Sequence, residues 1–239
     1  MISNNPFSGA RYLIQGFKLL LKPGLRRYVV MPLLINILVF SLLIWIGISQ
    51  FNLLLAWMLP QESWLAYLEF VLWPLFAVTV VLLTFYSFTI LANLFAAPFN
   101  GLLAEKVEQL LTGQLPDGGE SGLLHSIWPA MRSELTKLVY FLLRALPLLL
   151  LFVIPGVNLI APLLWFLFGI WYLALEYADY PMANSGIAFR DQHVRMKQVR
   201  YTALGFGGGL TLLMMIPILN FAAMPAAVAG ATAMWCDRK

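Results

Sequence analysis

Charged residues are scarce in this chain. Asp, Glu, Lys and Arg make up 11% of the 239 residues, whereas hydrophobic residues make up 61%. A soluble domain typically devotes about a quarter of its residues to charged side chains, because these form its water-facing surface. The composition therefore argues against an ordinary soluble domain and predicts an all-α integral membrane protein whose solvent is lipid.

Cysteine and histidine are nearly absent as well. A single cysteine, Cys236, excludes an internal disulfide and a cysteine-based metal cluster, and only two histidines occur. The sequence contains no HExxH zinc motif, no Walker phosphate loop and no GxSxG nucleophile motif. We therefore expect no enzyme activity, no cofactor and no metal. An intramembrane enzyme acting on a lipid would need a nucleophile or metal for which the sequence offers little.

Long stretches without charge are what the chain has in abundance. Four such runs occur, with 33, 35, 31 and 36 residues, at 28–60, 70–104, 145–175 and 201–236. A membrane-spanning helix needs about 20 apolar residues, so each run is long enough to cross once. The first run is far longer than the roughly 7–15 residues of a signal-peptide core, and we expect no cleavable signal.

The residues between the runs predict an orientation. Residues 1–27 carry five Lys and Arg and no acid, whereas residues 61–69 carry two Glu and no base. Segments rich in Lys and Arg stay in the cytoplasm. We therefore expect a cytoplasmic N-terminus and two long spanning helices, at 28–60 and 70–104. The segment 105–144, which also carries Lys and Arg, is expected to be cytoplasmic or interfacial.

The third and fourth runs begin and end beside basic segments, which one crossing cannot satisfy. Each is interrupted near its middle, by Pro155 to Asn158 and by Pro217 to Asn220. Proline removes a helix hydrogen bond, and Gly and Asn favour turns. We expect 145–175 and 201–236 to be re-entrant helical hairpins. Halves of about 15 residues reach roughly 22 Å into a core of roughly 30 Å. Kinked helices packed on their neighbours are the alternative.

Two segments have the pattern of an amphipathic helix. In 5–22, Asn5 before Pro6 is a helix-start signal. A polar stripe follows, opposite an apolar one; its members are Arg11, Gln15, Lys18 and Lys22. In 126–144 an apolar stripe again opposes a polar one, formed by Ser133, Lys137, Tyr140 and Arg144. We expect both helices to lie in the cytoplasmic membrane interface.

Few side chains in or beside the runs can carry chemistry. Glu176 and Asp179 have the i, i+3 spacing of one helix face, and Glu105 follows the second run. These carboxylates are candidates for proton-linked steps, although Glu176 and Asp179 also fit an ordinary solvated helix end. Asn158 and Asn220 lie at the expected turns. Because backbone at such breaks must face protein or water, they are candidates to line a pore.

The segment Pro23-Gly24-Leu25-Arg26-Arg27 is the most informative motif. Gly24 permits a tight turn, and the first N–H groups of the following helix have no helical partner. A helix start of this kind binds tetrahedral anions, and two guanidiniums add five donors each and two positive charges. Adjacent arginines before a first spanning helix are also the commonest topology signal, so both interpretations stand at this point.

Four long strings resemble the CysZ family of bacterial sulfate permeases. They are PGLRR followed by MPLLIN (23–36), NLFAAPFNGLLAE (93–105), IPGVNLIAPLLWFLFGIWYLALEYADYP (154–181) and IPILNFAAMPAAVAGATAMW (216–235). The resemblance runs nearly end to end. It implies sulfate uptake across the inner membrane for cysteine biosynthesis, a homo-oligomer, and two spanning helices with partly penetrating hairpins.

The same resemblance implies a sulfate-binding site at Gly24, Leu25, Arg26 and Arg27. The expected partners are sulfate, membrane lipids and further copies of the chain, and we expect no nucleic-acid partner. The principal alternative is a membrane scaffold or envelope-organising protein. In that case the arginines would bind lipid headgroup phosphates without solute flux.

Overall fold

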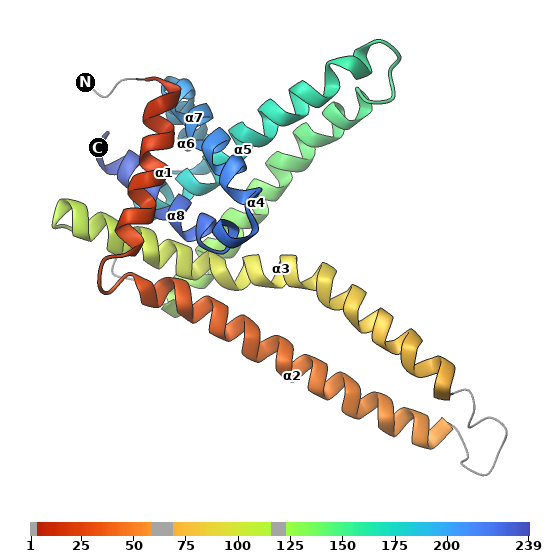
Figure 1. Cartoon of the computed structure of the whole chain (residues 1–239). Helices are drawn as coiled ribbons and strands as arrows, with labels where there is room; N and C mark the ends of the chain where they lie inside the picture. Colours follow the sequence, from red (N-terminus) through yellow and green to blue (C-terminus); the bar gives the residue numbers. More distant parts are fainter. Residues whose placement is uncertain (1–3, 59–68, 116–122) are drawn as a thin grey trace. The chain divides into compact units, whose positions relative to one another are not determined.

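The computed structural model describes residues 4–58, 69–115 and 123–239, and all regular elements in these residues are helical. The all-α class expected from the sequence is confirmed for this part of the chain. The helices are α1 (Pro6–Leu20), α2 (Arg26–Met58), α3 (Glu69–Thr112), α4 (Leu123–Leu150), the short 3-10 helix η2 (Val157–Leu159), α5 (Ala161–Asn184), α6 (Phe189–Gln198), α7 (Arg200–Met214) and α8 (Pro217–Cys236) (Figure 1). They form two compact units, one of residues 30–96 and one of the described parts of 1–29 and 97–239.

Two helices in the described residues are long and apolar enough to cross a membrane, Arg26–Trp57 and Ala161–Asn184. The first is the spanning helix expected at 28–60. The second span expected, at 70–104, falls within α3 and stays a prediction, because the side chains of 84–97 lie outside the described residues. α5 is longer than the half-helix we expected. Its 24 residues extend about 36 Å, since the helix continues past Glu176 to Asn184.

The unit of residues 30–96 contains most of α2 and of α3. Aromatic rings join the two helices: Phe51 stacks on Phe76 with ring centroids 3.9 Å apart, and Trp73 packs edge-on against Phe51 at 5.1 Å. Many large apolar side chains of this unit are exposed, among them Leu38, Trp45 and Val81. Water would penalise such a surface and hydrocarbon would not, so its composition is that of a lipid-facing hairpin.

The core of the other unit is built where α1 lies beside α7 and α8 (Figure 1). Glycines make this close approach possible. A Cβ added at Gly9 would collide with the Thr202 carbonyl oxygen, and one at Gly16 with the Ala226 carbonyl oxygen. Small residues at helix contacts allow backbones to approach closely in membrane proteins. α1 is therefore a packed core element, and its position in a membrane interface stays a prediction.

The helix breaks lie where the prolines predict them. α4 ends at Leu150 and α5 begins at Ala161, with a turn and η2 between them, and Gly156 has a φ of +84°. α7 ends at Met214, and α8 begins at Pro217 after a second turn. Helix boundaries alone define no membrane plane, so the re-entrant course of these hairpins stays a prediction.

In the polar stripe of α4, Lys137 is buried, whereas Arg144 is exposed. Lys137 of the polar stripe is 1% exposed, whereas Leu135 of the apolar stripe is 63% exposed. Lys137 therefore lies inside the protein, and the interfacial position expected for this helix stays a prediction. The buried Lys137 has its partner inside the protein, where the Asp179 carboxylate lies 3.2 Å away.

Candidate anion-binding site and polar network

The turn between α1 and α2 presents the arginine pair. α1 ends at Leu20 and α2 begins at Arg26, and Gly24 between them has a φ of +91°. Glycine adopts this left-handed conformation readily, whereas a Cβ makes it costly. Nothing lies within 4 Å of the position that a Cβ would take. The backbone angle, and not crowding, is thus what favours glycine here.

Arg26 and Arg27 are both exposed. Nη2 of Arg26 donates to the Leu21 carbonyl oxygen at 3.1 Å, and Nη2 of Arg27 donates to the Tyr28 hydroxyl at 3.1 Å. The Arg27 guanidinium also lies 4.9 Å from the centroid of the Tyr28 ring. A guanidinium has five N–H donors, so both side chains retain donors for a ligand while these contacts hold them near the turn.

Leu25 has a different role from its neighbours. Its side chain is 3% exposed and belongs to the hydrophobic core of its unit. It anchors the turn, and only its backbone could take part in an anion site. Its carbonyl oxygen accepts the Tyr28 N–H at 3.1 Å, which closes the first turn of α2. The site is therefore a helix start with positive dipole and two guanidiniums, a combination that attracts anions.

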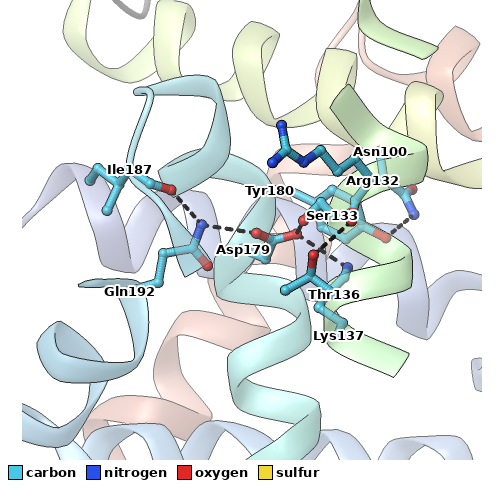
Figure 2. A network of polar contacts seen from close by, with 9 residues as sticks. All are labelled: Asn100, Arg132, Ser133, Thr136, Lys137, Asp179, Tyr180, Ile187 and Gln192. Atoms are coloured by element: carbon cyan, nitrogen blue, oxygen red, sulfur yellow. Dashed lines mark hydrogen bonds and ion pairs between the residues drawn. The ribbon is translucent and has the colours of Figure 1, made fainter. Parts of the chain in front are cut away.

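Asp179 is buried at the centre of a polar network between α4, α5 and α6 (Figure 2). Its carboxylate lies 3.2 Å from Nζ of Lys137, accepts from the Ser133 hydroxyl at 2.6 Å and accepts from Nε2 of Gln192 at 2.9 Å. Nε2 of Gln192 also donates to the Ile187 carbonyl oxygen at 2.9 Å. Asp179 is thus neither a solvated helix end nor an open cation site, because its oxygens are already engaged.

The other predicted polar residues are not gathered into one site. Glu105 is partly buried on α3, and burial raises the pKa of its carboxyl while the nearby Lys106 cation opposes the shift. Glu176 is partly buried on α5, whereas Asn158 and Asn220 are exposed at the two helix breaks. Within the described residues, no hydrogen bond or ion pair joins Glu105, Asn158 or Asn220 to the arginine pair.

Several polar residues of the structure were not singled out from the sequence as site residues. Ser133 and Lys137 are four apart on the polar stripe of α4, which was a usable signal. Gln192 gave no signal, because only the fold brings α6 to Asp179. Glu108 is buried and its Oε1 lies 3.2 Å from Nζ of Lys239, while its Oε2 has no hydrogen-bond partner in the described residues. The part of the chain that the structure describes also contains no cluster of three or more His, Cys, Asp or Glu able to hold a metal.

Comparison with known proteins identifies the family of this chain. The profile of the sulfate transporter CysZ/etoposide-induced protein 2.4 family matches residues 12–225. The chain belongs to this family. Proteins named sulfate transporter CysZ from Pseudomonas aeruginosa and Pseudomonas paraeruginosa are each 45% identical to it over 231 residues, which is 95% of this chain and 94% of theirs. The protein of that name from Pseudomonas fluorescens is also 45% identical, over 92% of its own length.

Family membership confirms the resemblance drawn from the four sequence strings. It makes the chain a membrane protein of a transporter family, in agreement with its two long apolar helices. The matched range contains the arginine pair, the polar network and both helix breaks.

Proposed function

We propose that this chain takes up sulfate across the bacterial inner membrane, supplies it for cysteine biosynthesis and catalyses no reaction. The observation that carries the proposal is the 45% identity, over 95% of the chain, to proteins named sulfate transporter CysZ. The exposed arginine pair at the start of a membrane-length helix supports it, because a sulfate transporter needs a place where the dianion exchanges water for protein donors.

Sulfate binds, in this proposal, at the α1–α2 turn formed by Gly24, Leu25, Arg26 and Arg27. Arg26 and Arg27 match the two charges of the anion, and the start of α2 contributes backbone N–H groups and a favourable dipole. The site consists of donors. Sulfate cannot donate a hydrogen bond at neutral pH, whereas hydrogen phosphate can, and its proton would meet no acceptor on either guanidinium. The site therefore favours sulfate over phosphate.

The anion then follows a path lined by water and walled by protein, since moving a bare dianion into hydrocarbon costs tens of kcal/mol. The hairpins of α4–α5 and α7–α8 enter the membrane partway, with Asn158 and Asn220 at their turns facing this path. α7, with 15 residues, fits a partly penetrating helix better than α5, which is long enough to cross. Further copies of the chain complete the wall as a homo-oligomer.

Orientation and coupling complete the proposal. The basic segments place the N-terminus in the cytoplasm. Glu105 and Glu176 are partly buried and are the carboxylates proposed to link flow to protons. Asp179 takes part only indirectly, by holding α4, α5 and α6 together, because its carboxylate is committed to Lys137, Ser133 and Gln192.

Uptake of radiolabelled sulfate into proteoliposomes tests the function and the site together. We expect the purified full-length chain to take up sulfate faster than empty liposomes, with little competition from phosphate. The double variant Arg26→Ala/Arg27→Ala should lose uptake. The matched control is Arg11→Ala/Lys18→Ala, which removes the same charge from exposed positions of α1 and should retain uptake.

Two results would contradict the proposal. Absence of uptake above empty liposomes at several pH values would remove autonomous transport and favour a scaffold that binds headgroup phosphates. Equal loss of uptake in both double variants would show that total positive charge matters and that the turn is no specific site.

A further inference from the structure

A pocket of about 440 Å³ opens where the ends of α5, α6 and α8 meet. None of its lining residues belongs to the α1–α2 turn. Its volume falls in the range of about 300–1,000 Å³ that holds organic ligands, and it exceeds what a lone oxyanion needs. Part of its wall is apolar, because the edges of three methionines contribute to it, Met182, Met196 and Met234, each less than 5% exposed.

The polar part of the wall is mainly cationic. Arg195 is exposed on α6, and its guanidinium lies 5.5 Å from the centroid of the Trp235 ring. Arg238, just after α8, is partly buried and also lines the pocket. The acidic residue of the wall, Asp237, already accepts a hydrogen bond from the Tyr12 hydroxyl at 2.9 Å. The pocket therefore presents more positive than negative charge.

Hydrogen-bond donors at this wall have no acceptor in the described residues. Trp235 is 6% exposed and its Nε1 has no partner, and the same holds for Nε and Nη1 of Arg238. A buried donor without an acceptor costs free energy, and folded proteins contain few such donors. Burial lowers the pKa of Arg238, while the nearby Tyr12 and Asp237 side chains oppose this shift. A negatively charged acceptor in the pocket would meet these donors if Trp235 and Arg238 turn towards it, because the three atoms are buried as the side chains stand.

The surroundings of the pocket are basic as well. Arg190 and Lys197 are exposed on α6, and Arg200 is exposed at the start of α7. The positive-inside rule assigns such segments to the cytoplasmic face, where anionic lipids meet the protein. Basic pockets beside membrane helices on that face bind anionic headgroups.

We propose that this pocket binds the headgroup of an anionic phospholipid, with the phosphate at Arg195 and Arg238 and the apolar part of the lipid against the methionines. A free phosphate or sulfate ion would use the guanidiniums but would leave the apolar wall uncovered. The lipid uses both parts of the wall. This site is separate from the sulfate site of the proposed function and does not depend on it.

Binding of short-chain lipids to the full-length protein in detergent tests the proposal. The probe is dihexanoyl phosphatidylglycerol, compared with dihexanoyl phosphatidylcholine and with inorganic phosphate. The readouts are native mass spectrometry and the shift in melting temperature. We expect phosphatidylglycerol to bind saturably and raise the melting temperature, and the other two to have little effect.

Three variants locate the site. Arg195→Gln and Arg238→Gln should bind phosphatidylglycerol about tenfold more weakly or worse, because each removes a charged donor. Arg195 is exposed, so its variant should fold even if Arg238→Gln does not. Trp235→Phe keeps the ring and removes the N–H, and should weaken binding less. The matched control, Arg190→Gln, removes the same charge from α6 outside the pocket wall and should bind as the wild type does.

Each contrary result would overturn the proposal in its own way. Equal stabilisation by inorganic phosphate, lost in the same variants, would make the pocket a simple anion site. Equal binding of phosphatidylcholine would show that headgroup charge is not recognised. Unchanged phosphatidylglycerol binding in Arg195→Gln would place any lipid site elsewhere.

Discussion

The ammonium of Lys137 lies 3.2 Å from the carboxylate of Asp179, although both side chains are almost wholly buried. Nζ of Lys137 also lies 4.7 Å from the centroid of the Tyr180 ring, so the cation has an aromatic face as a second neighbour. The pair joins α4 to α5, and Gln192 extends the connection to α6.

Breaking this pair should destabilise the protein strongly. Lys137→Met or Asp179→Leu alone should cost about 3–5 kcal/mol, because each removes one partner of a buried pair and leaves the other charge uncompensated. The double variant Lys137→Met/Asp179→Leu should lose less than the sum of the singles. Melting temperatures in detergent would reveal this, and simply additive losses would show that the two charges are not coupled.

Close helix packing around α1 predicts a second set of variants. Gly16→Ala should destabilise by about 1–3 kcal/mol, since its Cβ would collide with the backbone carbonyl of Ala226. Gly169→Ala in α5 is the control: nothing lies within 4 Å of its Cβ position, so alanine should be neutral or slightly stabilising. Thermal denaturation compares the two, and equal melting temperatures would mean that the helices can separate at little cost.

The left-handed conformation of Gly24, in the proposed sulfate site, predicts that strain at this turn reduces sulfate uptake whereas similar strain elsewhere does not. Gly24→Ala strains a turn with a φ of +91° and should reduce sulfate uptake, because the arginine pair moves with the turn. Gly113→Ala introduces similar strain at a φ of +76°, after the end of α3, in equally open space. Proteoliposome uptake should fall in the first variant and persist in the second. Loss in both would point to general strain.

The pKa of Glu105 predicts a pH dependence of transport. Burial raises this pKa, so the carboxyl binds a proton more readily as pH falls than an exposed glutamate would. If Glu105 faces the sulfate path, its neutral form repels the dianion less, and uptake should rise towards acidic pH. Glu105→Gln should give high uptake at every pH. A wild-type pH profile retained in the variant would remove Glu105 from the path.

His193 predicts a pH dependence of stability. Burial, together with the Lys197 and Arg144 cations, lowers the pKa of its imidazole below the usual 6.5. The unfolded chain therefore takes up a proton before the folded chain does, and stability falls as pH decreases from about 6.5. His193→Phe keeps the ring contacts with Tyr140 and Trp171 and should flatten the decline in melting temperature between pH 7.5 and pH 5. An unchanged decline would assign it to other groups.

Local features of the fold were readable from the sequence, and contacts between distant segments were not. The breaks at Pro155 and Pro217 followed from the missing N–H of proline, which acts within a few residues. α5 ends later than the apolar run 145–175 indicates, because the charged Glu176 that follows this run does not end the helix. Asp179 instead finds Lys137 inside the protein, and the helix continues.

The same contrast between local features and long-range contacts holds for the candidate sites. The turn at Gly24 follows from adjacent residues and agrees with the sequence pattern, whereas the binding of sulfate there stays a prediction. The pocket beside Trp235 needs α5, α6 and α8 to meet, and no spacing in the sequence announces it. The burial of Lys137 on α4 does not follow from the sequence pattern, because only the fold brings Asp179 to it as a partner.

The glycine-mediated contacts of α1 also constrain how the chain matures in the cell. Gly9 and Gly16 pack against α7 and α8, about 200 residues later in the sequence. At a synthesis rate of roughly 5–20 residues per second, the first helix waits on the order of ten to forty seconds for its partners to emerge. During that interval its packing face must be shielded by lipid or by an insertion factor, so α1 reaches its native contacts only after α7 and α8 have been made.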